Sequence, residues 1–339
     1  MAEVLKSSAE TIEIGGQRVP LHYGDPSAEY WAARRGAVVM DRSHEGRLRA
    51  VGRDRIDLLH RMSTNDLDGL AVGEARPTVL TTALARIVDV LWVFNRGETA
   101  LCLTSAGTSA SVRKWLSGYI FYSDKVKFEE ASSELSQVGI YGPRAGAAAD
   151  ALLAGAEALA ENRFVEQAGL IVLRGRPLAG DGFTVIAPRD RLEGLWNQAV
   201  EAGATPAGEA AYQLLRLAAG EPYVGHEIAE EYIPLEANLW GAVSFSKGCY
   251  IGQEIIARME SRGKLARRLV GLKLEAPVAE GSEIRAGEAQ TVVGRVTTAG
   301  ALPDVGPAAL GFVKTAHAEP GTVLRVGEVK GVVVALPLV

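Results

Sequence analysis

Cysteine, methionine and aromatic residues are scarce in this 339-residue chain. It has two cysteines and four methionines, and 6% of its residues are Phe, Trp or Tyr. Cys102 and Cys249 stand far apart, so the chain does not have the disulfide framework of a small secreted protein. Two thiols are also too few to hold an iron–sulfur cluster, which usually takes four ligands. We therefore expect a reducing compartment, the cytoplasm.

A long apolar run and an excess of positive charge are also lacking. No apolar stretch approaches the roughly 20 residues that span a bilayer. The first eight residues have mixed charge and no apolar core, so a secretory signal is not expected. The chain has 36 Lys and Arg against 41 Asp and Glu, a net charge of −5. This balance predicts that it binds neither nucleic acid nor a membrane surface.

Several motifs of nucleotide-binding proteins and hydrolases are missing. The glycine patterns of dinucleotide sites and phosphate-binding loops do not occur, and neither does a Gly-x-Ser-x-Gly elbow. The run from His226 to Glu230 resembles part of a zinc-binding helix but lacks the second histidine. We therefore predict no metal site.

The most informative segment that is present runs Lys247-Gly-Cys-Tyr-Ile-Gly-Gln-Glu-Ile-Ile-Ala-Arg258. Its glycines allow close approach of the backbone to a ligand, and a helix is predicted from Gln253. In that helix Glu254 and Arg258 lie one turn apart in the order that favours an ion pair. Cys249 stands before the helix and beside Lys247, and both features favour its thiolate. The alternative is a glycine-rich turn with a half-buried, inert cysteine.

The distribution of apolar residues predicts an α+β protein. Strands alternate with helices through the first two thirds of the chain, including a helix from Ser27 to Arg35 capped by Ser27 and an Ala-rich helix over 145–160. From Arg267 onward, short alternating strands separated by Gly and Pro turns predict a small all-β barrel or sandwich. A domain boundary is expected near residue 265.

The motif over 247–258 resembles the signature of the YgfZ family, folate-binding proteins related to the T-protein, the aminomethyltransferase of the glycine cleavage system. Further segments stand in the order that this superfamily shows: Gly36–His44, Gly46–Arg49, Thr64–Asp66, Arg216–Gly220 and Ile233–Leu239. The resemblance covers nearly the whole chain. It implies three domains in a ring around a central, folate-sized cavity: residues 1–50 with 135–225, residues 51–134 with 226–265, and a C-terminal β-barrel over 266–339.

The resemblance also implies site residues. Asp89 aligns with the first Asp of a T-protein motif whose second Asp is replaced here by Val90. A buried carboxylate is costly unless it is paired or has a role, so both structural pairing and catalysis stay open for Asp89. Ala218 stands where T-proteins have the glutamate that holds the pterin ring, so Glu236 and Gln253 are the candidate acceptors. The catalytic candidates are Cys249 and Asp89, and the predicted folate-binding residues are Lys247, Tyr250, Gln253, Glu254, Arg258, Glu236 and His44.

Three functions follow as hypotheses. In the first, the protein binds tetrahydrofolate or another reduced folate and supports synthesis or repair of iron–sulfur proteins, its client partners, with Lys247 keeping Cys249 ionised. In the second, it is a folate-dependent aminomethyltransferase or demethylase of the T-protein type, with Asp89 near the reacting nitrogen. In the third, folate is structural or regulatory, and the basic segment 258–268 docks a partner protein.

Overall fold

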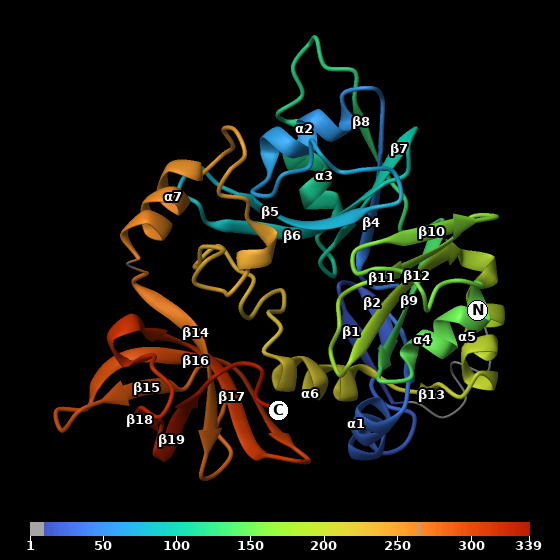
Figure 1. Cartoon of the computed structure of the whole chain (residues 1–339). Helices are drawn as coiled ribbons and strands as arrows, with labels where there is room; N and C mark the ends of the chain where they lie inside the picture. The colour runs from blue at the N-terminus through green and yellow to red at the C-terminus, as the bar shows by residue number, and fades with distance from the viewer. Residues whose placement is uncertain (1–9, 264) are drawn as a thin grey trace. The chain divides into compact units, whose positions relative to one another are not determined.

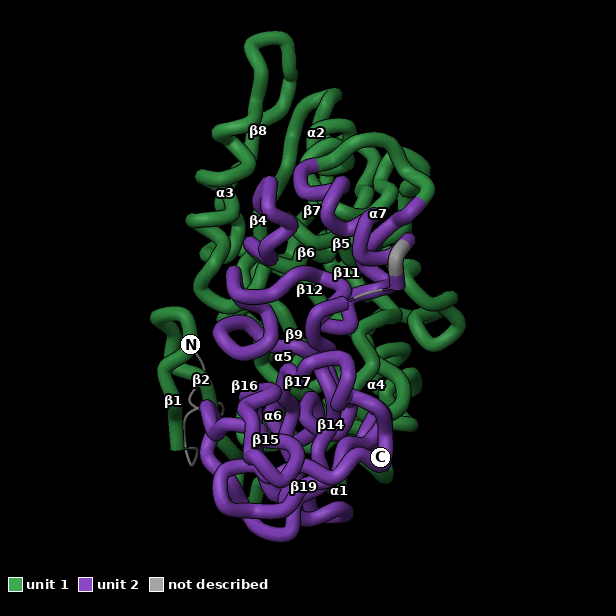
Figure 2. The backbone as a smooth tube through the Cα atoms, turned by 90° about the vertical axis from the view of Figure 1, so that its left-hand side faces the viewer, with its two compact units in different colours: residues 1–80, 89–212, 246–250 green, residues 81–88, 213–245, 251–339 purple. Residues whose placement is uncertain are grey.

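The computed structural model describes residues 10–263 and 265–339 (Figure 1). Contacts between Cα atoms divide the chain into two compact units, which are interleaved in sequence (Figure 2). The first unit comprises residues 1–80, 89–212 and 246–250, and the second comprises residues 81–88, 213–245 and 251–339.

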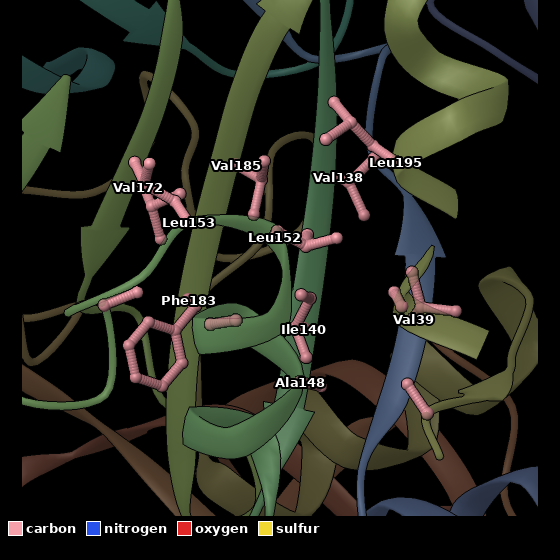
Figure 3. Packing of buried hydrophobic residues seen from close by; sticks show 14 of the residues in the cluster. Val39, Val138, Ile140, Ala148, Leu152, Leu153, Val172, Phe183, Val185 and Leu195 are labelled. Carbon is pink, nitrogen blue, oxygen red and sulfur yellow. The ribbon is translucent and has the colours of Figure 1, made fainter. Parts of the chain in front are cut away.

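A six-stranded sheet forms the larger core of the first unit. Its order is β10 (Phe164–Gln167), β11 (Leu170–Arg174), β12 (Asp181–Pro188), β9 (Leu135–Gly142), β3 (Val38–Asp41) and β13 (Thr205–Pro206). Alternate side chains of β9 and β12, such as Val138, Ile140, Phe183 and Val185, lie on one face, as the two-residue period of a strand requires. They form one buried cluster with residues of α4 (Ala145–Leu152) and α5 (Leu192–Glu201) (Figure 3). The helix α1 (Pro26–Arg35) precedes β3.

A second sheet includes the strand that carries the catalytic candidate Asp89. Its five strands run in the order β5 (Ala75–Thr81), β6 (Ile87–Asn95), β7 (Thr99–Thr104), β4 (Gly46–Val51) and β8 (Lys127–Glu130). The helices α2 (Arg55–Met62) and α3 (Ser109–Ser117) connect its strands, and β1 (Thr11–Ile14) and β2 (Gln17–Pro20) form a separate hairpin.

The second unit contains a closed β-barrel of six strands. Their order is β14 (Arg267–Leu274), β17 (Gly306–Lys314), β16 (Thr291–Leu302), β15 (Glu283–Ala286), β18 (Val323–Val326) and β19 (Val329–Val334). Inward-facing residues such as Leu272, Ile284, Val296 and Val333 fill it. The helix α6 (Glu209–Ala219) leads from the first unit into the second, and α7 (Gln253–Arg262) precedes the barrel.

The predicted α+β class and the C-terminal all-β barrel are confirmed. The ring of three domains and its central cavity stay predictions. Within the described residues, no helix is long and apolar enough to cross a membrane.

Two local predictions were wrong. The Ala-rich helix ends at Leu152 rather than near residue 160, because the backbone becomes extended at Leu153 and turns left-handed at Gly155. Asp25, not Ser27, caps α1: its carboxylate accepts a hydrogen bond from the backbone N–H of Ser27 at 2.9 Å, while Pro26 occupies the first helical position.

Candidate functional site

Lys247 anchors the loop that carries Cys249. Its Nζ donates hydrogen bonds to the carbonyl oxygens of His60, Ser63 and Asn65 at 2.5, 2.7 and 2.9 Å. Ser63 is the C-cap of α2, where helix carbonyls lack intrahelical partners and the helix dipole is negative, so an ammonium is stabilised there. Burial nonetheless lowers the pKa of Lys247 to about 8, against the attraction of Asp66.

This geometry corrects the role expected for Lys247. An ammonium has three N–H donors, and each points to a backbone carbonyl, so Lys247 has no N–H left to donate to the Cys249 thiol. The Tyr250 ring, whose centroid lies 5.1 Å from Nζ, is buried beside it. Cys249 itself is exposed. Two buried side chains therefore flank an accessible thiol, and the alternative of a half-buried cysteine is wrong.

Gly252 fixes the start of α7 within the second unit. Its φ is +86°, and a Cβ at this position would lie 2.8 Å from the carbonyl oxygen of Thr82 and 2.9 Å from the Cα of Ala85. Nearby, the Thr81 hydroxyl donates to the carbonyl of Ile251 at 2.6 Å. Gly248 has no such constraint, because a Cβ added there would meet no atom within 4 Å and its φ is not left-handed. Close approach is thus required at Gly252 only.

The predicted ligand residues of α7 lie at its beginning. Gln253 is half-buried, whereas Glu254 and Arg258 are exposed. Although their spacing favours an ion pair, no salt bridge joins Glu254 to Arg258 in the described part of the chain. Both charged groups therefore face solvent, where a ligand could reach them.

Asp89 is buried and hydrogen-bonded within the first unit. Its Oδ2 accepts from the Thr108 hydroxyl at 2.6 Å and from the Ser105 N–H at 3.2 Å, and Oδ1 accepts from the Val90 N–H at 2.8 Å. Burial raises the pKa of Asp89, and these hydrogen bonds oppose the shift. The carboxylate thus has structural partners, and it stays the only catalytic candidate on β6.

His44 belongs to another cluster of the first unit, which sequence reasoning did not find. The Glu45 carboxylate accepts from Arg176 at 2.7 Å, and Arg42 donates to Glu209 at 2.6 Å. His44 Nε2 lies 4.0 Å from Glu209 and makes no hydrogen bond within the described residues. Burial, aided by repulsion from Arg42, lowers the pKa of His44 to about 3, so its imidazole is neutral at physiological pH.

The signal for this cluster was present in the sequence but short. Arg42 and Glu45 flank Ser43-His44, and two opposite charges beside a candidate histidine indicate a paired network. Arg176 and Glu209 were not predictable partners, because they stand far from residue 45 along the chain. Arg42 also lies 3.5 Å above the centroid of the Tyr212 ring.

Glu236 is part of the second unit and is buried, so the alternative of a solvated loop residue is wrong. Its Oε2 accepts from Arg267 Nε at 3.2 Å and from the Ile233 N–H at 3.4 Å. No hydrogen bond to Oε1 is formed by the residues that the structure describes. Glu236 lines an open cavity of about 710 Å³ together with Arg86, Arg267 and Lys314.

Cationic groups and one carboxylate thus meet in this cavity of the second unit. The Arg267 guanidinium lies 4.6 Å from the centroid of the Tyr232 ring, which stacks on Phe312 with centroids 3.5 Å apart. In the described ranges, no group of three or more His, Cys, Asp or Glu side chains is placed to hold a metal ion.

Comparisons with known proteins agree with this architecture. Residues 1–247 match the GCVT N-terminal domain, and residues 267–339 match the glycine cleavage T-protein C-terminal barrel domain. An "Aminomethyltransferase" of Symbiobacterium thermophilum is 30% identical over 95% of this chain and 90% of its own length. A protein of Arabidopsis thaliana, "Putative transferase, chloroplastic", is 31% identical over 89% of this chain and 71% of its own.

A solved structure has the same fold. The crystal structure of the glycine cleavage system aminomethyltransferase T from Bartonella henselae is 25% identical, with a TM-score of 0.89. The match covers 98% of this chain and 95% of that one. The matched length therefore includes both larger sheets and the barrel.

Proposed function

We propose, from the premise that this chain belongs to the glycine cleavage T-protein family, that it binds a reduced folate and supports the synthesis or repair of iron–sulfur proteins, as YgfZ-like proteins do. The observation that carries this proposal is the exposed thiol of Cys249, held between the buried Lys247 and Tyr250. A cysteine without a function is usually buried. Here the surrounding loop is anchored and the thiol is accessible.

The residues present fit a folate. A pterin ring offers N–H donors, and Glu236 Oε1 is an acceptor that has no hydrogen bond to the described residues. The glutamate part of a folate is anionic, and Arg86, Arg267 and Lys314 line the same cavity as Glu236. Bound tetrahydrofolate supplies a carrier for one-carbon units. The protein's residues would bind and orient it.

The position of Ala218 favours a YgfZ-like role over a transferase. It stands where the T-protein pattern has a pterin-holding glutamate, and it is buried, with its carbonyl accepting from the Leu338 N–H at 2.7 Å. The methyl side chain cannot accept hydrogen bonds from a ligand. Recognition of the pterin must therefore use other acceptors, Glu236 and Gln253.

An aminomethyltransferase is the second candidate, and Asp89 favours it. The carboxylate stands where the T-protein motif has its first Asp, and the similar proteins of Symbiobacterium and Bartonella are named aminomethyltransferases. A buried acid whose pKa is raised is suited to proton transfer. Its hydrogen bonds to Ser105 and Thr108 would orient it for that task.

Calorimetric titration with tetrahydrofolate tests the binding step. We expect saturable binding in the micromolar range, about −8 kcal/mol, that weakens at least tenfold in Glu236→Gln. Glu231→Gln is the matched control, because this neighbouring carboxylate is exposed and also pairs with Arg267. If the wild-type protein did not bind tetrahydrofolate, folate would be rejected as the ligand. The remaining hypothesis would be a scaffold that docks a partner protein.

Two activity measurements separate the candidates. In cells that lack the gene, iron–sulfur enzyme activities should fall and be restored by the wild type but not by Cys249→Ser. Full rescue by Cys249→Ser would remove the thiol from the mechanism. Formation of methylene-tetrahydrofolate from an aminomethyl donor, lost in Asp89→Asn with folate affinity retained, would instead establish the transferase.

A further inference from the structure

A second cavity lies wholly within the first unit and has a volume of about 720 Å³. Its walls come from the hairpin of β1 and β2, the turn from Asp41 to His44, the first residue of α3, and the segments that follow β8 and β12. This volume is in the range of sites that hold a metabolite. None of its lining residues belongs to the 246–258 segment, and His44 is its only predicted folate ligand.

Two guanidinium groups line the cavity. Arg18 lies on β2 and is exposed, and no ion pair or side-chain hydrogen bond joins it to another residue that the structure describes. Arg189 follows β12 and lies close enough to Arg47 to lower the pKa of that buried guanidinium, for which burial is the main cause. Guanidinium groups bind carboxylate and phosphate oxygens through paired N–H donors.

Two helices begin at the same cavity. Ser109 is the first residue of α3 and Leu192 is the first of α5, and both line the wall. In neither helix does the N-cap side chain accept a hydrogen bond from a backbone N–H of the first turn. The hydroxyl of Thr108, the N-cap residue of α3, donates to Asp89 instead. Helix N-termini carry partial positive charge, which adds to that of the guanidinium groups.

Acceptors are present as well. Asp41 Oδ1 accepts from the Ser43 N–H at 2.9 Å, while its Oδ2 has no hydrogen bond within the described residues. Glu130 accepts from the Ser132 N–H at 3.1 Å. Its hydrogen bonds from Ser132 and Ser109 lower its pKa against the effect of burial, so it stays ionised. A purely anionic ligand would be repelled by these carboxylates, so a ligand must offer donors to them.

We propose that this cavity binds a small organic anion that also carries hydroxyl or ammonium donors, with its anionic group toward Arg18 and Arg189 and its donors toward Asp41 and Glu130. The neutral His44 forms an uncharged part of the wall and adds no repulsion. A sugar phosphate and a short zwitterionic peptide share this chemistry. The site does not depend on the proposed folate function.

Calorimetry with ribose 5-phosphate and with glycylglycine tests the proposal, and ribose is the uncharged control. We expect saturable binding of one of the two charged probes, and none of ribose at the same concentration. Binding of ribose 5-phosphate would identify a phosphate as the anionic group of the ligand, and binding of glycylglycine would identify a carboxylate. Failure of both probes, or equal binding of ribose, would overturn the proposal.

Three variants test whether the charged probe binds in this cavity. Arg18→Gln removes one guanidinium from a hairpin and should weaken binding at least tenfold, whereas Arg53→Gln, an exposed arginine of the same unit, should have no effect. Ser133→Trp leaves every charge in place but fills the cavity, and should abolish binding. All three variants should retain the wild-type affinity for tetrahydrofolate. Wild-type probe affinity in both Arg18→Gln and Ser133→Trp would reject this cavity as the site.

Discussion

The Nζ atom of Lys247 lies 2.7 Å from the carbonyl oxygen of Ser63, the C-cap residue of α2. The motif that carries Cys249 therefore supplies the cation that caps this helix. The two residues are 184 positions apart in the sequence. A single cation thereby satisfies backbone carbonyls of one segment and holds the loop of another. The position of the exposed thiol depends on this contact within the first unit.

Lys247→Met should destabilise the protein. The variant keeps most of the aliphatic stem but leaves three carbonyl oxygens without their donor, at a cost of about 2–4 kcal/mol in the free energy of unfolding. Urea unfolding measures it. Lys127→Met, at an exposed position, should change this free energy by less than about 0.5 kcal/mol. Equal stability of Lys247→Met and wild type would show that the anchor contributes nothing.

The two glycines of the motif should respond differently to a methyl group. Gly252→Ala forces a positive φ on alanine and places Cβ against Thr82 and Ala85, so we expect a loss of at least about 1 kcal/mol. Gly248→Ala meets no atom and should be neutral within about 0.5 kcal/mol. Thermal unfolding of the pair makes the comparison. A larger loss at Gly248 than at Gly252 would contradict the geometry of the loop.

Glu227 should be essential for the stability of the second unit. It is buried and accepts from Arg216 at 3.2 Å and from the Thr298 hydroxyl at 2.7 Å. Glu227→Gln leaves the buried guanidinium without a counter-charge, which typically costs about 3–5 kcal/mol. Chemical denaturation should detect this loss, while the exposed Glu231→Gln should lose no more than about 1 kcal/mol. Similar losses of unfolding free energy in both variants would show that Glu227 is no more important for stability than an exposed carboxylate.

Stability should fall with acidification before most carboxylates titrate. The folded pKa of His44 is about 3, below the ordinary value of 6.5, because burial and Arg42 disfavour its charged form. Between these values the unfolded chain binds a proton that the native state does not. Stability is therefore full above about pH 6.5 and decreases by up to about 1.4 kcal/mol per pH unit as the pH falls.

The window from about pH 6.5 to 4.5 isolates this effect from the carboxylates. His60, whose pKa is lowered by burial and by Lys247, acts in the same direction, so His60→Gln is the comparison variant. His44→Gln should flatten the profile more than His60→Gln does. An unchanged slope in His44→Gln would show that the histidine does not carry the dependence.

Local patterns predicted much of the fold because they depend on neighbours in the chain. The alternating residues after Arg267 predicted the strands of the barrel, and the run from Gln253 predicted α7. The end of the Ala-rich helix was mispredicted for the same reason. Alanine favours a helix, but its propensity does not locate the last residue. The helix ends because the backbone becomes extended at Leu153 and left-handed at Gly155. Partners distant in sequence leave no such local signal.

The sequence by itself determined the α+β class, the C-terminal barrel and the family motif that draws attention to Cys249, since periodicity and short motifs are local properties. Only the tertiary structure decided what Lys247 does, because its carbonyl partners lie near residues 60–65. It likewise decided that Glu45 pairs with Arg176 and that Glu236 pairs with Arg267. A charge in the sequence acquires its role only from the groups that folding places within hydrogen-bonding distance, where burial makes a missing partner costly.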